Sequence, residues 1–167
     1  MDTRQLGTLP DRRPRTSLLA SVLACELVGA SGSVFTVMGL GAWYDGLAKP
    51  PFNPPSWVFG PVWTALFALM GVALWLVWRA DATERPVRIA LLAFAGQFVL
   101  NVAWSAAFFG ARSPALGLVV IVALWLAIVG TIVAFDRVDR RAALLLVPYL
   151  AWVSFAAVLN ASLWWLN

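Results

Sequence analysis

The stretch WVFGPVWTALFALMGVALWLVW, residues 57–78, contains no charged residue. A helix of about 20 apolar residues crosses the hydrocarbon core of a bilayer. Three further runs have the same character, and a fifth is interrupted only by Glu26 and a few small polar residues. The chain is therefore predicted to be an all-α membrane protein, a bundle of five transmembrane helices. The runs cover Leu18–Leu40, Trp57–Trp78, Val87–Phe109, Ala115–Phe135 and Ala142–Leu166.

The composition leaves little room for a soluble domain. Of the 167 residues 62% are apolar and 12% charged, whereas soluble chains are nearer half apolar and a quarter charged. We expect a disordered basic tail at residues 1–16 and one five-helix domain at residues 17–167. The start of the chain also resembles a signal peptide with a faint cleavage motif before Cys25. Because the apolar run continues to Leu40, an uncleaved first span is favoured.

Basic residues are concentrated on one side of the predicted spans. On the other side only Lys49 and Arg112 are basic, so the positive-inside rule places the N-terminus in the cytoplasm and the C-terminus outside. This distribution accounts for the net charge of +4 through membrane topology and lipid contact, with no nucleic-acid partner. A bacterial cell membrane is the expected location. The residues on the basic side are Arg4, Arg12, Arg13, Arg15, Arg79, Arg85, Arg88, Arg137, Arg140 and Arg141.

Two residue types that often carry chemistry are scarce. The chain has no histidine, which excludes a Ser/His/Asp triad, a histidine-ligated haem and the usual zinc site. Cys25 is the single cysteine, so no intrachain disulfide forms. We expect neither a metal site nor a required cofactor.

The connector WYDGLAKPPFNPPSW, residues 43–57, contains four prolines. Proline restricts its own backbone and disfavours helix at the preceding residue, so this segment is predicted to be neither span nor helix. Its rigidity and its aromatic residues indicate a lid over a cavity.

Polar and aromatic side chains share one face of the third span. Gln97, Asn101, Trp104 and Phe108 recur at helical spacing. The two amides alone are more typical of hydrogen bonds between membrane helices. Together with aromatic stripes on two other spans they favour a pocket for a large planar apolar ligand. Those stripes are Trp63, Phe67 and Met70 on the second span, and Tyr149, Trp152, Ala156 and Leu159 on the fifth.

Other unusual residues lie inside the spans. Glu26 is either protonated and hydrogen-bonded or marks a proton or ion path. Pro148 is predicted to kink the fifth span, and Asn160 to contact a neighbouring helix. Four small residues could allow close helix approach and dimerisation, namely Gly29, Ser33, Ala103 and Ala107.

Several linked motifs resemble the tryptophan-rich sensory protein family, also called the translocator protein family. The resemblance runs from the first span to the C-terminus. The motifs are Trp43-Tyr44-Asp45-x-Leu47-x-Lys49-Pro50, Pro54-Pro55-x-Trp57-Val58-Phe59-x-Pro61-Val62-Trp63, Gln97-x-x-x-Asn101-x-x-Trp104, Phe108-Phe109-Gly110-Ala111-Arg112 and Pro148-Tyr149-Leu150-Ala151-Trp152.

This resemblance implies a five-helix bundle, usually dimeric, that binds porphyrins in a pocket closed by the first loop. Family members are also described as degrading porphyrin in light, with tryptophans that match Trp63 and Trp152. The chain departs from the family's sterol motif, since Ala161 replaces its tyrosine and no basic residue follows Arg141. Carried over by position, the pocket residues would be Tyr44, Pro54, Trp63, Phe67, Gln97, Asn101, Trp104, Trp152 and Ala156.

Three functions are consistent with these features. A porphyrin-binding receptor or sensor that modulates porphyrin handling or transport is favoured. The alternatives are light-dependent porphyrin breakdown at Trp63 and Trp152, which would make the protein an enzyme, and a small-molecule transporter in which Glu26 couples to protons. The expected partners are a porphyrin or another planar apolar molecule, membrane lipid and a second copy of the chain.

Overall fold

The computed structural model describes residues 14–80 and 82–167, and every regular element in them is a helix. In this part of the chain five helices are long and apolar enough to cross a membrane, which confirms the predicted fold class. Residues 1–13 of the predicted tail lie outside the described part, and residues 14–16 belong to the first turn of α1. The elements are α1 (Pro14–Gly39), α2 (Ala42–Gly46), α3 (Ser56–Trp78), α4 (Arg85–Ser105), the π-helix η1 (Ala106–Gly110), α5 (Pro114–Asp136), α6 (Arg140–Leu145) and α7 (Val147–Leu166).

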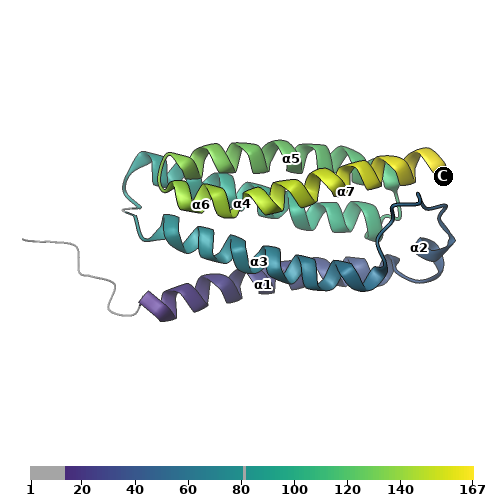
Figure 1. The fold of residues 1–167 in the computed structure, drawn as a ribbon, viewed down its shortest axis with the longest axis horizontal. Helices are drawn as coiled ribbons and strands as arrows, with labels where there is room; N and C mark the ends of the chain where they lie inside the picture. The colour runs from purple at the N-terminus through teal and green to yellow at the C-terminus, as the bar shows by residue number, and fades with distance from the viewer. Residues whose placement is uncertain (1–13, 81) are drawn as a thin grey trace, which may run out of the picture.

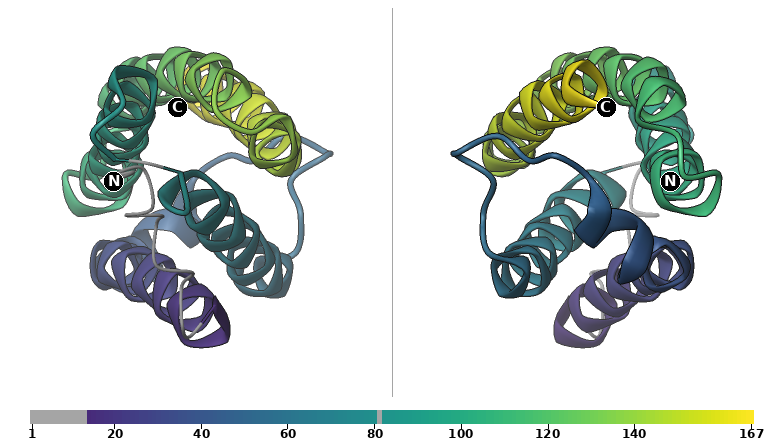
Figure 2. Two further views of the ribbon diagram at one scale, coloured as in Figure 1. Left: turned by 90° about the vertical axis from the view of Figure 1, so that its left-hand side faces the viewer. Right: turned by 90° about the vertical axis from the view of Figure 1, so that its right-hand side faces the viewer.

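The spans run up and down in chain order, so the bundle has two distinct ends (Figure 1). One end carries the turns at residues 79–80, 82–84 and 137–139, and we call it the basic end. The other carries α2, the connector 47–55 and the C-terminus, and we call it the α2 end. Viewed along the bundle, α1 and α3 form one side, while α4, α5 and α7 form a curved row on the other (Figure 2).

Local signals fix where several helices begin. Pro114 occupies the first turn of α5, where its missing N–H costs least, and the Ser113 hydroxyl accepts a hydrogen bond from the Leu116 N–H at 3.2 Å. The Asp139 carboxylate caps α6 in the same way, accepting from the Arg141 N–H at 2.8 Å. Short, capped turns of this kind keep consecutive spans antiparallel.

The connector prediction is wrong for residues 43–46, which belong to the one-turn helix α2, and for Ser56 and Trp57, which begin α3. The prolines that exclude helix begin only at Pro50, so they place no restriction on the residues before Lys49. Residues 47–55 contain no helix, as predicted. The short α2 therefore gives the start of the connector a defined shape against the bundle.

The fifth span is broken at Leu146, between α6 and α7, and Pro148 lies in the first turn of α7. The kink predicted at this proline is thus present as an interruption. α6 makes close backbone contacts with α3, whereas α7 packs mainly against α5. The span therefore stays close to α3 at the basic end and leaves it towards the α2 end.

Side chains fill the half of the bundle nearer the basic end. Met70, Val77, Ala90 and Phe135 have no exposed surface there. α1 and α3 approach closely at Gly71, where a Cβ would lie 2.5 Å from the Val22 Cα atom. Close approach of small residues is the usual way to pack membrane helices, because lipid offers no hydrophobic driving force between them.

Candidate ligand-binding cavity

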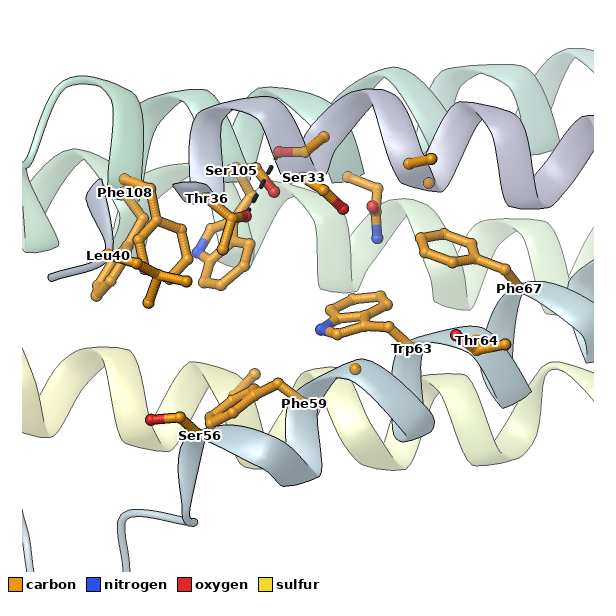
Figure 3. A pocket seen from close by; sticks show the side chains of 18 of the residues that line it. Ser33, Thr36, Leu40, Ser56, Phe59, Trp63, Thr64, Phe67, Ser105 and Phe108 are labelled. Atoms are coloured by element: carbon orange, nitrogen blue, oxygen red, sulfur yellow. Dashed lines mark hydrogen bonds between the residues drawn. The ribbon is translucent and has the colours of Figure 1, made fainter. Parts of the chain in front are cut away.

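A cavity of about 340 Å³ lies in the half of the bundle nearer the α2 end. Its lining residues come from α1, α2, α3, α4, η1 and α7 (Figure 3). Ligand pockets typically have volumes of roughly 300–1,000 Å³ and mainly apolar walls with a few placed polar groups. This cavity has both properties.

Two stacked aromatic pairs border the cavity. Trp63 stacks on Phe67 with ring centroids 5.4 Å apart, and both rings belong to α3. Trp104 of α4 stacks on Phe108 of η1 with centroids 5.5 Å apart. Figure 3 shows the Trp63 ring extending from α3 into the space, with Phe108 on the far side. Flat rings on both sides of a void suit a flat guest that can stack on them.

The π-helix η1 explains how consecutive phenylalanines reach the same cavity. The Ala111 N–H donates to the Ala106 carbonyl at 2.7 Å, a five-residue step that widens the turn. Phe108 and Phe109 therefore both line the void, with centroids 4.8 Å apart. Single π turns inside α-helices occur frequently at functional sites.

A chain of buried hydrogen bonds presents one amide to the cavity. Asn101 donates through Nδ2 to the Tyr149 hydroxyl at 2.9 Å, and this hydroxyl donates to Gln97 Oε1 at 2.9 Å. Asn101 lines the cavity, while its Oδ1 accepts no hydrogen bond from the described residues. Gln97 is 1% exposed, and its Nε2 has no partner in the described part of the chain. Asn101 is therefore positioned to contact a ligand, with Tyr149 and Gln97 behind it.

The predicted site residues fall into two groups. Six of them line the cavity, and three, Gln97, Trp152 and Pro54, do not. Trp152 lies behind Phe59, with ring centroids 5.9 Å apart, and its buried Nε1 has no partner among the described residues. The six lining residues are Tyr44, Trp63, Phe67, Asn101, Trp104 and Ala156.

Asn160 joins three elements, in agreement with its prediction as a helix-contact residue. Its Oδ1 accepts from the Trp104 Nε1–H at 3.1 Å, and its Nδ2 donates to the Pro114 carbonyl at 2.7 Å. These bonds hold the Trp104 indole in place between α4 and α7. Asn160 also lines the cavity, which the sequence did not indicate.

One face of α1 contributes a wall that sequence reasoning missed. Small and polar residues recur at helical spacing on this face, but the spacing does not indicate which element or cavity the face contacts. Ala30 and Ser33 of α1, and Gly60 and Thr64 of α3, line the cavity and are exposed. The cavity therefore opens sideways between α1 and α3. The lining residues of α1 are Glu26, Gly29, Ala30, Gly32, Ser33, Thr36 and Leu40.

Tyr44 of α2 covers the α2 end of the cavity. It is buried against Phe109, with centroids 5.8 Å apart, and its hydroxyl donates to Asn53 Oδ1 at 3.1 Å. Burial raises the pKa of the Tyr44 hydroxyl above its ordinary value, so the hydroxyl remains protonated. The Lys49 ammonium group lies 4.9 Å from the centre of the Tyr44 ring. Tyr44 thus joins the cavity wall to the connector above it.

The C-terminal residue holds this connector from outside. Asn167 Oδ1 accepts from the Ala48 N–H at 2.9 Å, and Asn167 Nδ2 donates to the Ala48 carbonyl at 3.1 Å. This pair of bonds joins α7 to the segment between α2 and Pro50. The connector is therefore held on both sides of Lys49. Ala48 is hydrogen-bonded to Asn167, and Asn53 is hydrogen-bonded to Tyr44.

The residues around the cavity can bind and stack, but they do not assemble a metal centre. Nowhere in the described part of the chain do three His, Cys, Asp or Glu side chains come together. Among the lining residues Glu26 is the only one with a charged side chain. The site therefore offers aromatic faces, hydroxyl groups, one free amide oxygen and one carboxylate.

Comparison with known proteins identifies close relatives. Residues 21–166 match the model of the TspO/MBR family. The chain is 50% identical to the tryptophan-rich protein TspO of Chlorobaculum tepidum, over 86% of this chain and 90% of that protein. It is 43% identical to the protein of the same name from Archaeoglobus fulgidus, over 90% and 96%. It is 44% identical to the human translocator protein, over 73% of each chain.

Proposed function

Because the chain belongs to the TspO/MBR family of membrane sensory and translocator proteins, we propose that it is a receptor for a porphyrin or a similar flat tetrapyrrole. The observation that carries this proposal is the pair of stacked aromatic walls, Trp63 with Phe67 and Trp104 with Phe108, on either side of one cavity. A flat macrocycle would stack on these rings, while the free Asn101 oxygen would accept a hydrogen bond from it. Occupancy would then modulate porphyrin handling or transport.

Titration with protoporphyrin IX tests the proposal. We expect the purified protein to shift the porphyrin absorption band and the porphyrin to quench tryptophan fluorescence. Trp63→Ala removes one stacked wall and should weaken binding about tenfold, since an aromatic pair is worth about 0.5–1.5 kcal/mol beyond its buried area.

Trp165→Phe is the matched control, because Trp165 is 84% exposed and does not line the cavity. It should bind porphyrin as the wild type does. Equal losses in Trp63→Ala and Trp165→Phe, or no binding by the wild type, would count against the proposed receptor.

Light-dependent porphyrin breakdown is the second candidate, and the position of Trp63 in the cavity wall favours it. Trp63 faces the cavity, where its indole could exchange an electron with an excited porphyrin, and Phe59 lies between the cavity and Trp152. Illuminating the complex should bleach the porphyrin faster than free porphyrin if this activity exists. Trp63→Phe should then lose more of the rate than Trp152→Phe. If the complex bleaches no faster than free porphyrin, the protein binds porphyrin without degrading it.

Proton-coupled transport is less well supported. A path from Glu26 to the basic end would have to pass Met70, Ala73 and Val77, which have no exposed surface. We therefore assign Glu26 to ligand binding.

We also propose that two copies associate through an apolar groove between α1 and α4. Val99, Val102, Ala103 and Ala106 line this groove, whereas Gly29 faces the cavity. Of the small residues predicted to permit dimerisation, only Ala103 is therefore on the groove. Ala103→Trp should convert a dimer to a monomer in sedimentation measurements in detergent, while Ser33→Trp, at the cavity mouth, should leave a dimer intact.

The basic end is proposed to face the cytoplasm of a bacterial cell, with the C-terminus outside. Seven arginines of the described part cluster at this end, the distribution on which the positive-inside rule depends. Single cysteines introduced as Ala82→Cys and Ala111→Cys, at opposite ends, test the orientation. An impermeant maleimide applied to intact cells should label Ala111→Cys alone, and the reverse pattern would invert the assignment.

A further inference from the structure

Glu26 places a carboxylate in the wall of the cavity. Glu26 lies on α1 at the end of the cavity nearer the bundle's basic half, and it is the only charged residue in the lining. It forms no ion pair or hydrogen bond with any other described residue, and the ion pair seen in residues 14–80 and 82–167 joins Arg141 to Asp139. An ionised side chain at membrane depth is costly unless something pairs with it.

An aromatic ring lies one helical turn from Glu26. Gly29 follows Glu26 by one helical turn, and a Cβ on Gly29 would overlap the ring of Phe67. Phe67 in turn stacks on Trp63. Because the glycine lets an aromatic ring lie directly on α1, Glu26 is placed beside a stacked aromatic pair. Aromatic faces carry negative potential and attract organic cations, as a carboxylate does.

The remaining polar groups point to the same ligand chemistry. Asn101 donates a hydrogen bond through Nδ2 to the Tyr149 hydroxyl. Its Oδ1 atom accepts no hydrogen bond from the described residues, so it can accept one from a ligand. No lysine or arginine lines the cavity in the described part of the chain. At the opposite end, Lys49 of the connector lies over the ring of Tyr44, which lines the cavity. The cavity therefore has a carboxylate at its Glu26 end and an ammonium group in the connector that covers its other end.

We propose that Glu26 is a cation subsite, which selects flat aromatic ligands that carry a protonated nitrogen. The nitrogen lies against the Glu26 carboxylate, and the ring extends along Trp63 towards the lid. This inference rests on the proposed function, because it uses the same ligand cavity, and it adds the orientation of the ligand within that cavity. A porphyrin would enter with its carboxylates towards Lys49, because its acidic edge is repelled by Glu26.

A pair of probes with the same three-ring shape tests the subsite. We use 9-aminoacridine, which is cationic at neutral pH, and neutral anthracene, and follow quenching of tryptophan fluorescence in the full-length protein in detergent. The wild type should bind the cation about tenfold more tightly than Glu26→Gln does, which corresponds to about 1.4 kcal/mol. Anthracene should bind both proteins equally.

Two variants serve as controls. Glu26→Asp keeps the charge and should retain the preference for the cation. Asp45→Asn removes a carboxylate from exposed α2, outside the cavity lining, and should change nothing. A Glu26→Gln protein that binds 9-aminoacridine as tightly as the wild type overturns the subsite. So does an Asp45→Asn protein that loses the preference to the same extent.

Protoporphyrin titrations on the same proteins separate this inference from the proposed function. Retained porphyrin binding by Glu26→Gln shows that its cavity is intact, so that a selective loss of 9-aminoacridine binding is due to charge. A wild type that binds the acridine through Glu26 but does not bind porphyrin would refute the receptor proposal and keep the cation subsite. If the wild type binds porphyrin and Glu26→Gln does not change 9-aminoacridine binding, the cation subsite is refuted and the receptor proposal is kept.

Discussion

The two halves of the bundle are built from the same helices and differ in how they pack. On α3, Met70, Ala73 and Val77 in the basic half have no exposed surface, while Gly60 and Trp63 in the other half face a cavity. Both halves of α3 consist mainly of apolar residues. The comparison shows that side-chain size at the crossings, together with the course of the helices, decides where a membrane bundle is solid and where it is hollow.

Two structural features separate the halves. At Gly71 the backbones of α1 and α3 nearly touch, whereas large rings such as Trp63 and Phe108 stand between the helices at the α2 end. The break at Leu146 also takes α7 away from α3. Since lipid is as apolar as the interior of the protein, no hydrophobic force closes the resulting void. The cavity can therefore persist beneath Tyr44.

The largest expected effect comes from truncating the packed half. Met70→Ala removes a side chain with no exposed surface and leaves a void among close neighbours. We expect it to lower the free energy of unfolding by about 2–5 kcal/mol. Leu40→Ala, at the exposed rim of the cavity, should cost much less. Unfolding in mixed micelles, followed by tryptophan fluorescence, measures both, and equal losses would remove the distinction between the halves.

The same substitution at two glycines of α3 sharpens the comparison. A Cβ at Gly71 would lie 2.5 Å from the Val22 Cα atom, so Gly71→Ala must push α1 away and should cost about 1–3 kcal/mol. At Gly60 a Cβ meets nothing within 4 Å. Gly60→Ala should therefore be neutral or stabilise the helix by up to about 1 kcal/mol. The melting temperatures of the two variants should shift from the wild-type value in opposite directions, or by clearly different amounts.

A smaller effect is expected at the boundary between the halves. Tyr149→Phe removes the hydroxyl that joins Asn101 to Gln97. Hydrogen bonds between membrane helices contribute about 0.6 kcal/mol on average, so the two bonds together should account for about 1 kcal/mol. Because Asn101 loses the group that orients it, affinity for protoporphyrin should fall as well. Unchanged affinity would show that the amide does not contact the ligand.

The smallest effect belongs to the basic end and depends on pH. The hydrogen bond from the Arg141 side chain lowers the pKa of Asp139 below its ordinary value of 3.8. A lowered pKa in the folded protein stabilises it above the ordinary value, and this contribution is lost as the pH falls through the folded value. The gain is small because solvent screens an exposed pair. Wild type and Asp139→Asn should therefore differ slightly in melting temperature at pH 6, and the difference should shrink as the pH falls below 3.8.

The candidate site was predictable in part. Helical spacing on α4 placed Asn101 and Trp104 on one face, and both line the cavity. Gln97 shares that face, yet it is one turn too deep and contacts Tyr149 instead. Periodicity gives the direction of a side chain around a helix and says nothing about how far along the helix the cavity extends.

Residues contributed by other elements were harder to predict. Ser33 and Thr36 are small polar residues on a face of α1, and only the separation of α1 from α3 makes that face a wall. Trp152 lies in an aromatic stripe, but Phe59 stands between it and the cavity. The prolines that follow α2 conceal it in the sequence, because they disfavour helix only from Lys49 onward and leave residues 43–46 unrestricted.

The sequence by itself determined the number of spans and the distribution of charge between the two ends, because both follow from lengths of apolar chain and from arginine positions. Only the tertiary structure decided that the bundle is hollow near α2, that Asn101 presents a free oxygen and that Glu26 stands alone beside aromatic rings. Those properties depend on distances between helices, which are set by the packing of side chains from different spans.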